Sequence, residues 1–253
     1  MEYNFKNQIK FDEKTIGSEQ PCYVIAEIGI NHNGDLSLAK KLIDAAVFAG
    51  ANAVKFQKRN LESIYQKEIL ENATLDSQGT EILIDILHKV EFNEDDFKNI
   101  VDYCNKKQIT FLCTPWDIPS VDFLERLNVS GYKIASADMT NFPLLKHISK
   151  TKKPLIISTG MSSMDEIEKT VIFIKNQDVP FLILHCNSTY PSPVEMLNLE
   201  LIPVLREKFD VPIGYSGHES DIIPSVTAAN MGAVLIERHI TLDKTMDGLD
   251  RKS

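Results

Sequence analysis

The stretch "CYVIAEIGINHNGDLSLAKKLIDAAVFAGANAVKFQ", Cys22–Gln57, decides the fold. It opens with a short apolar run, Cys22–Gly29, which is typical of a buried strand, and it closes with a second such run, Ala53–Gln57. Between them, "LSLAKKLIDAAVFAGA" has apolar residues that recur at helical spacing. A strand, a helix and a strand in this order predict a βαβ unit, whose two strands are parallel.

The same alternation continues to the end of the chain. Six further strands are predicted at "ITFLCTP" (109–115), "GYKIAS" (131–136), "PLIIST" (154–159), "FLILHCN" (181–187), "VPIGYSGH" (211–218) and "AVLIERH" (233–239). Helices are predicted near Thr80–Lys89, Glu94–Lys107, Ile118–Leu127, Pro143–Lys150, 164–176, Leu199–Lys208 and Ile222–Met231. Eight strands in strict alternation with helices favour a (β/α)8 TIM barrel over an open sheet. A glycine-rich turn after the first strand, which a dinucleotide-binding fold needs, is absent.

The barrel is expected to occupy residues 21–253, after a polar N-terminal extension over residues 1–20. The chain stops after its eighth strand with "TLDKTMDGLDRKS", so we expect no eighth helix within it. Ser163 and Glu166 form a capping-box pattern that predicts where the helix 164–176 begins.

Composition and charge exclude several classes of partner. The 253 residues are 43% hydrophobic and 25% charged, which is ordinary for a globular protein. The net charge of −9 argues against a nucleic acid or an anionic membrane as partner. No signal-peptide core or bilayer-spanning run is present, and the four cysteines have neither CxxC nor zinc-site spacing. We therefore predict a cytoplasmic protein with reduced thiols.

Polar residues gather where the predicted strands end, which is where a (β/α)8 barrel carries its active site. Seven of the eight strands contribute: Glu27; Lys55 and Gln57; Lys133 and Ser136; Ser158 and Thr159; the turn "HCNSTYP"; Ser216 and His218; Glu237 and His239. Any one of them, taken alone, is as well explained by a salt bridge or a structural hydrogen bond. Buried charges without partners are costly, so the whole set predicts a functional site.

One strand contains a lysine where the pattern demands an apolar residue. "KIASADMTNFPLL", Lys133–Leu145, begins with that lysine and continues with small polar residues. We expect its ammonium group to lie at the barrel mouth beside Lys55 and Ser158, paired with an anion of the substrate. Ser136 adds a hydroxyl group there, and Pro143 suits the first turn of the next helix.

The residue types at this mouth suggest their chemistry. Lys55 and Lys133, with serine hydroxyls, suit a phosphate or a carboxylate. His218 and His239 lie on adjacent strands, so both imidazoles can reach one divalent metal ion. Glu27 and Glu237 can act as base, acid or acceptor of sugar hydroxyls. Either lysine can alternatively form a Schiff base with a carbonyl substrate, although the histidine pair favours metal-assisted carbonyl activation.

Several long motifs occur in one order: "AEIGINHNGDLSLAKKLIDAAVFAGANAVKFQKR", "YKIAS", "ISTGMS", "HCNSTYPSP", "GYSGHE" and "ERHITLDK". With them the chain resembles the sialic acid synthase (N-acetylneuraminate synthase) family from about Tyr23 to its last residue. The resemblance implies a C–C bond-forming transferase that condenses phosphoenolpyruvate with an N-acylated amino sugar, such as N-acetylmannosamine, to a nonulosonic acid and phosphate. It also implies a homodimer, in which relatives use a C-terminal antifreeze-like domain that this chain does not show.

The resemblance assigns roles to individual residues. It implies that Lys133, Ser136, Ser158, Ser216 and the "CNSTY" turn bind phosphoenolpyruvate, with either Asn187 or Ser188 as the contact in that turn. It implies that His218 and His239 bind Mn²⁺ or Mg²⁺. It places Glu27, Gln57, Tyr190 and Asp250 against the acceptor sugar.

Two departures, the C-terminal motif and the antifreeze-like domain that this chain does not show, qualify these expectations, as do two rival functions. Where many relatives read "PGPDHKAS", this chain has "MDGLDRKS", so Asp247 replaces a proline and Arg251 a histidine, which predicts a different acyl or deoxy pattern in the acceptor. One rival is another phosphoenolpyruvate–aldose synthase of the keto-deoxy octulosonate or heptulosonate phosphate type, with Lys58 and Arg59 holding the acceptor's phosphate. The other is a non-catalytic barrel that binds a sugar acid.

Overall fold

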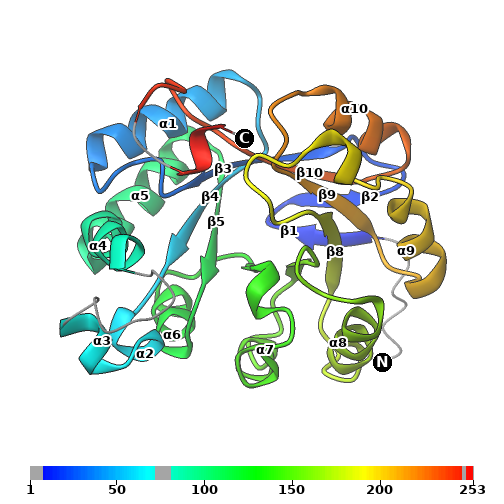
Figure 1. The fold of residues 1–253 in the computed structure, drawn as a ribbon, viewed down its shortest axis with the longest axis horizontal. Coiled ribbons are helices and arrows are strands. Elements are labelled where there is room, and N and C mark those ends of the chain that lie inside the picture. Colours follow the sequence, from blue (N-terminus) through cyan, green and yellow to red (C-terminus); the bar gives the residue numbers. More distant parts are fainter. Residues whose placement is uncertain (1–7, 72–80, 247–248, 253) are drawn as a thin grey trace.

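The structure, a computed structural model, describes residues 8–71, 81–246 and 249–252. Eight parallel strands form one sheet in the order β5-β4-β3-β10-β9-β8-β7-β6, with helices around it (Figure 1). The end strands of this sheet, β5 and β6, also lie next to each other. The sheet therefore curls into a nearly closed barrel, and the predicted (β/α)8 fold is confirmed. The strands are β3 Tyr23–Gly29, β4 Ala53–Lys58, β5 Thr110–Pro115, β6 Tyr132–Ile134, β7 Leu155–Ser158, β8 Phe181–Cys186, β9 Ile213–Gly217 and β10 Leu235–His239.

Helices surround the barrel as the periodicity predicts. They are α1 Leu36–Phe48, α4 Glu81–Val90, α5 Glu94–Lys107, α6 Ile118–Arg126, α7 Phe142–Ser149, α8 Met164–Lys175, α9 Leu201–Phe209 and α10 Ile223–Asn230. Side-chain caps begin most of them, and Ser163 and Glu166 form the predicted capping box of α8. Two short helices after β4, α2 Leu61–Ile64 and α3 Lys67–Glu71, have no counterpart in the sequence prediction. The short helices η2 Ser136–Asp138, η3 Val194–Met196 and η4 Leu249–Lys252 lie after β6, β8 and β10.

The hydrophobic core has two parts because alternate residues of each strand face opposite sides. In β3, Ala26 and Ile28 belong to the larger cluster between strands and helices, whereas Ile25 belongs to a smaller cluster formed near the starts of the strands. None of the helices in the described ranges is long and apolar enough to cross a membrane.

An antiparallel hairpin, β1 Gln8–Phe11 and β2 Lys14–Gly17, precedes the barrel. Ile9, Phe11 and Ile16 of this hairpin are buried in the smaller core cluster together with Ile25 and Leu235. These three side chains therefore close the end of the barrel where the strands begin. The residues predicted to form a polar extension thus include a part of the hydrophobic core, and the opposite end carries the polar groups.

Candidate active site

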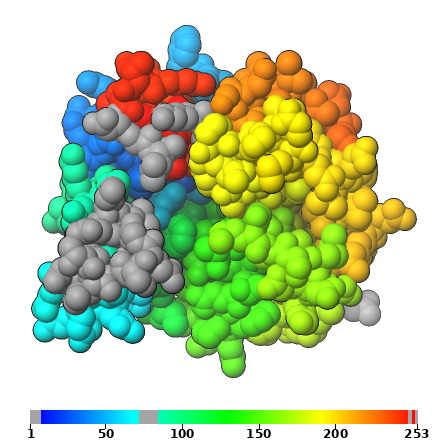
Figure 2. All heavy atoms as spheres, in the orientation of Figure 1, coloured from blue at the N-terminus to red at the C-terminus, as the bar shows by residue number. Residues whose placement is uncertain are grey.

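A cavity of about 220 Å³ lies at the carboxyl ends of the strands. In the space-filling view, the yellow segment after β8 and the red C-terminal segment border the hollow over these ends (Figure 2). Thirteen of the fourteen predicted site residues line it: Glu27, Lys55, Gln57, Lys133, Ser136, Ser158, Ser188, Tyr190, Ser216, His218, Glu237, His239 and Asp250. The barrel thus brings together groups that are spread over more than 200 positions of the chain.

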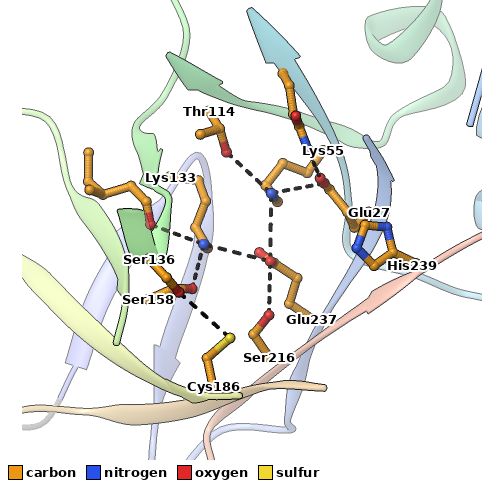
Figure 3. Close-up of polar contacts among 12 residues, drawn as sticks. Glu27, Lys55, Thr114, Lys133, Ser136, Ser158, Cys186, Ser216, Glu237 and His239 are labelled. Carbon is orange, nitrogen blue, oxygen red and sulfur yellow. Dashed lines mark hydrogen bonds and ion pairs between the residues drawn. The ribbon is translucent and has the colours of Figure 1, made fainter. Parts of the chain in front are cut away.

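Four buried charges form a chain across the floor of this cavity (Figure 3). Nζ of Lys55 lies 2.9 Å from Oε2 of Glu27 and 3.6 Å from Oε1 of Glu237. Nζ of Lys133 lies 3.7 Å from the same Oε1 of Glu237. Each ammonium therefore has a carboxylate partner within the protein, and Glu237 connects the two lysines.

Lys133, the lysine in the apolar strand, lies as predicted at the mouth. Its Nζ donates to Oγ of Ser158 at 2.6 Å and to the carbonyl oxygen of Ile134 at 3.1 Å. The predicted contact with Ser158 is confirmed. Lys55, the other expected neighbour, meets Lys133 through Glu237, because two ammonium groups repel each other and the carboxylate separates their charges.

Burial and charge shift the pKa values of this network in opposite directions. Burial lowers the pKa of Lys133 even though the Glu237 carboxylate opposes that shift. For Lys55, burial acts in the same sense, but the charges of Glu237 and Glu27 outweigh it and raise the pKa. Burial raises the pKa of Glu27, whereas in Glu237 the two ammonium groups outweigh burial and lower the pKa. Glu237 is therefore the more strongly ionised carboxyl group.

Serine hydroxyls lie at the end of β7 and just after the ends of β6 and β8. The backbone N–H of Gly160 donates to Oγ of Ser136 at 3.0 Å, and Ser188 lines the cavity after β8. Asn187 is the predicted residue that does not line it, because its Nδ2 donates to the carbonyl oxygen of Met196 at 3.1 Å. Of the two alternatives in this turn, the structure thus directs Ser188 toward the cavity.

The two histidines lie side by side, with ring centroids 5.6 Å apart. Nδ1 of His218 lies 2.6 Å from the carbonyl oxygen of Asn187, which only accepts, so Nδ1 carries the proton and Nε2 keeps its lone pair. Burial lowers the pKa of His218 to about 4, which keeps the ring neutral at physiological pH. Nδ1 of His239 is buried 3.7 Å from Oδ2 of Asp250 and forms no hydrogen bond with any residue that the structure describes.

A second group of contacts orients Gln57 beside Glu27. Nε2 of Gln57 donates to Oε1 of Glu27 at 3.0 Å, and its Oε1 accepts from Arg59. The Arg59 guanidinium stacks on Trp116, 4.3 Å from the ring centroid. Lys58, its neighbour in the chain, turns away and pairs with Glu91. Lys58 and Arg59, the two cations that would bind the phosphate of an acceptor, therefore already contact different groups of the protein.

The C-terminal segment brings Asp250 to the cavity wall. The fully buried Arg251 donates to the carbonyl oxygen of Asn31 at 2.6 Å and to the hydroxyl of Thr241, which fixes η4 over the end of β10. Gly29 has a φ of +54°, and a Cβ there would lie 3.2 Å from Oδ2 of Asp250. The predicted departure at Asp247 lies outside the described residues.

Several lining residues were not predicted individually, namely Thr114, Trp116, Ala135, Ala137, Met161 and Cys186. Thr114 belongs to β5, the one strand for which no polar group was expected, and its Oγ1 accepts from Nζ of Lys55 at 3.2 Å. The signal was available, because Thr114 lies near the end of "ITFLCTP". A threonine in an apolar strand is too common to reveal a site by itself.

Comparison with known proteins gives consistent matches. The NeuB family matches residues 42–253. A mouse protein named N-acetylneuraminate-9-phosphate synthase is 40% identical over 240 residues, which are 94% of this chain and 67% of that protein. A Legionella pneumophila protein named N,N'-diacetyllegionaminic acid synthase is 38% identical over 244 residues, 94% of this chain and 68% of that one.

Solved structures agree with these matches. The crystal structure of N-acetylneuraminic acid (sialic acid) synthetase from Leptospira borgpetersenii, in complex with citrate, is 36% identical and superposes with a TM-score of 0.89. The match covers 98% of this chain and 82% of that chain. A truncated 3-deoxy-D-arabino-heptulosonate 7-phosphate synthase from Thermotoga maritima has a TM-score of 0.74 at 14% identity, which shows a shared fold alone.

Proposed function

The chain belongs to the NeuB family of enzymes, and we propose that it condenses phosphoenolpyruvate with an N-acylated amino sugar to give a nonulosonic acid and phosphate. The names of the mouse and Legionella relatives support this class of product. The observation that carries the proposal is the buried pair of ammonium groups, Lys55 and Lys133, in one cavity with serine hydroxyls and two imidazoles.

Phosphoenolpyruvate would occupy the side of the cavity around Lys133. The hydroxyl of Ser158 accepts a hydrogen bond from Lys133, so its own proton remains available to a phosphate or carboxylate oxygen. Ser136 also accepts, from the backbone N–H of Gly160, and its own proton points to Sγ of Cys186 at 3.8 Å, a weak acceptor that a substrate oxygen can replace. Ser188 lies nearby and can add a third donor. Charge-assisted hydrogen bonds from the lysines would hold the anion and stabilise negative charge as phosphate leaves.

The proposal includes a divalent ion, Mn²⁺ or Mg²⁺, held by His218 and His239. The donors fit, because His218 keeps the lone pair of Nε2 and His239 has a buried nitrogen, Nδ1, that forms no hydrogen bond within the described ranges. Among the residues that the structure describes, no group of three or more His, Cys, Asp or Glu side chains is arranged to hold a metal ion, so oxygen atoms of substrate or water would complete the shell. When bound, such an ion polarises the acceptor's aldehyde and supplies positive charge.

The two glutamates suit different proton-transfer roles. Glu237 stays ionised between the lysines, and its Oε2 has no hydrogen-bond partner within the described part of the chain. As the C2=C3 electron pair of phosphoenolpyruvate forms the new bond from C3 to the aldehyde carbon of the acceptor, water adds to C2, and phosphate then leaves by cleavage of the C2–O bond. We assign to Glu237 the orientation of this water, with transfer of its proton to Oε2. Glu27, whose pKa is raised and which is bound to Gln57, suits proton exchange with the acceptor's hydroxyl groups.

The acceptor sugar would lie between Gln57, Tyr190 and Asp250, all of which line the cavity. A homodimer is also part of the proposal. Exposed Ile222, Ile223 and Val226 at α10 support it, because neighbouring exposed apolar side chains mark association surfaces. Light scattering on the purified protein tests the dimer, and a monomer at micromolar concentration would contradict it.

One assay tests the reaction and separates it from its rivals. The protein is incubated with Mn²⁺, phosphoenolpyruvate and a panel of aldoses, and phosphate release and product mass are followed. Release with N-acetylmannosamine or a related N-acyl sugar, free or phosphorylated, supports the proposal. Release only with a phosphorylated pentose or tetrose would support a keto-deoxy sugar acid phosphate synthase. No release with any sugar, together with measurable binding of a sugar acid, would support a non-catalytic barrel.

A further inference from the structure

An ion pair between a fully buried glutamate and a largely buried arginine joins the chain neighbours of the two histidines, outside the cavity. Nη1 of Arg238 lies 2.5 Å from Oε1 of Glu219, whose side chain is fully buried. Glu219 follows His218 in the chain, and Arg238 precedes His239. Neither residue of the pair lines the cavity. The pair links the ends of two strands, and each of its members is the chain neighbour of one of the two histidines. Chance burial of two charges does not explain this position.

Further hydrogen bonds make the Glu219 carboxylate immobile. The hydroxyl of Tyr215 donates to its Oε2 at 2.8 Å, and the hydroxyl of Ser225 lies 3.3 Å from its Oε1. Arg238 in turn donates to Oγ of Ser225 at 2.9 Å and to the carbonyl oxygen of Asp221 at 3.0 Å. The network thus joins β9, β10, α10 and the loop before α10, which lie together in Figure 1.

The sequence makes room for this carboxylate. A Cβ on Gly217 would lie 2.7 Å from Oε2 and 2.8 Å from Oε1 of Glu219, closer than non-bonded atoms approach. Any other residue at Gly217 would therefore displace the carboxylate. Gly217 is also the residue that Arg238 faces in the register of β9 and β10, so the pair connects the strands at their last paired position.

Stability alone is a weak reason for such a pair. The desolvation of two charges offsets much of their attraction, and apolar residues of similar volume are often as stable. Geometry provides a better reason. Arg238 and His239 are neighbours in β10 and point to opposite sides, and Glu219 directly follows His218 just after the end of β9. A rigid connection between Glu219 and Arg238 therefore fixes how far apart His218 and His239 lie. Their ring centroids are 5.6 Å apart.

We propose that Glu219 and Arg238 are positioning residues, which set the spacing of His218 and His239 and thereby the affinity of the site for its divalent ion. The inference rests on the metal site of the proposed function. Loss of the pair removes neither imidazole but lets the strand ends that carry them move, and weaker metal binding follows without loss of the anion site around Lys133.

Mn²⁺ binding, followed by the electron paramagnetic resonance of the free ion, tests this inference. Glu219→Gln should raise the Mn²⁺ dissociation constant about tenfold, as loss of outer partners of a metal site does. Phosphoenolpyruvate binding without metal, followed by the fluorescence of Trp116, should change less than about twofold. Trp116 is the only tryptophan of the sequence and lines the cavity. Glu168→Gln is the matched control, since Glu168 pairs with Lys208 on the surface at 2.9 Å.

A second variant covers the case that Glu219→Gln does not fold, because it leaves the partly buried Arg238 without its counter-charge. Glu219→Gln combined with Arg238→Met removes both charges, and the same rise of about tenfold is expected. Mn²⁺ binding as tight as that of the unchanged protein, in either folded variant, would overturn the inference. Failure of the metal site itself is distinguishable, since His218→Ala would then bind Mn²⁺ as tightly as the unchanged protein.

Discussion

The two ends of the barrel are built from the same strands and differ in every other respect. β3 contributes Ile25 to the closed end and Glu27 to the mouth, and β10 contributes Leu235 and Glu237 in the same way. The closed end is apolar and sealed by the hairpin, whereas the mouth holds four buried charges. Residues only two positions apart on one strand therefore have different roles: the first contributes to stability and the second to chemistry.

The difference is energetic as well as chemical. At the closed end, burial of apolar surface stabilises the fold by about 25 cal/mol per Å². At the mouth, burial of Lys133 opposes its charge, which is visible as a lowered pKa despite the Glu237 carboxylate. The charges of the two lysines and the two glutamates cancel, so the fold tolerates their burial at the mouth but gains little stability from it. Changes at the closed end should therefore affect folding, and changes at the mouth should affect turnover.

The largest effect is expected at the closed end. Phe11 is fully buried in the smaller core cluster, and Phe11→Ala should lower the free energy of unfolding by about 3–5 kcal/mol. Urea unfolding measures it. Turnover per folded molecule should stay within about twofold of the unchanged protein. Phe48→Ala is the control, because Phe48 is 95% exposed and should change stability by less than about 0.5 kcal/mol. An equal loss in both variants would contradict the division of roles.

At the mouth, Lys133→Met should reduce turnover by about 10²–10³-fold, the usual loss when a group that stabilises developing charge is removed. The loss of stability should be smaller than that of Phe11→Ala, since Glu237 keeps Lys55 at 3.6 Å. Steady-state phosphate release and urea unfolding give the two values. Lys208→Met, a surface control, should change neither. Retention of more than about a tenth of the turnover in Lys133→Met would remove Lys133 from the anion site.

The fold was predictable because it depends on local periodicity. All eight barrel strands and their order along the chain follow from apolar runs that alternate with helical patterns. The hairpin was not predictable in this way. Ile9, Phe11 and Ile16 are isolated apolar residues in a polar segment, and they become buried because the barrel offers them an open end. Burial of that kind is a tertiary event, which no short window of sequence shows.

The site was predictable as a set of residues and less so as a set of contacts. Alternation placed Lys133 and Glu237 at the same mouth, but it could not show that Glu237 lies between the two lysines. The Glu219–Arg238 pair was missed for a related reason. Both residues stood beside predicted histidines, yet their burial depends on how α10 packs, with Ser225 completing the contact.

An effect of pH on stability should appear in a third region, the loop between β3 and α1. His32 is buried and stacked on Phe92, and burial lowers its pKa to about 4. Below its ordinary value of 6.5, the unfolded chain takes up a proton that the folded chain refuses, so stability falls as pH falls. The loss from His32 should reach about 3 kcal/mol between pH 6.5 and 4.

Urea unfolding at about pH 7, 6, 5 and 4, for the unchanged protein and for His32→Gln, isolates this contribution. The backbone N–H of Gly34 donates to Nδ1 of His32 at 3.1 Å. The amide oxygen introduced by His32→Gln would keep an acceptor for this N–H, but the amide does not titrate. The stability advantage of the unchanged protein should shrink as pH falls through this window. Parallel pH curves for the two proteins would show that His32 is not held neutral by its surroundings.

The smallest effect concerns the acceptor side of the mouth, where Arg59 contacts Gln57 and Trp116 without lining the cavity. Arg59 fixes the amide of Gln57 so that Nε2 donates to Glu27 at 3.0 Å. Arg59→Met should therefore raise the KM for the acceptor sugar about tenfold, which corresponds to about 1.4 kcal/mol. The KM for phosphoenolpyruvate should stay within about twofold, because Lys133 and Ser158 lie on other strands.

Lys58→Met is the control that makes this prediction sharp. Lys58 and Arg59 are adjacent cations, but Lys58 pairs with Glu91 on the other side of the strand. If the direction of each side chain decides its role, Lys58→Met leaves the KM for the acceptor unchanged, while Arg59→Met raises it. An equal rise in both variants would mean that positive charge near the cavity, and not the orientation of Gln57, governs acceptor binding. Such a result would return Lys58 and Arg59 to the role of an acceptor-phosphate site.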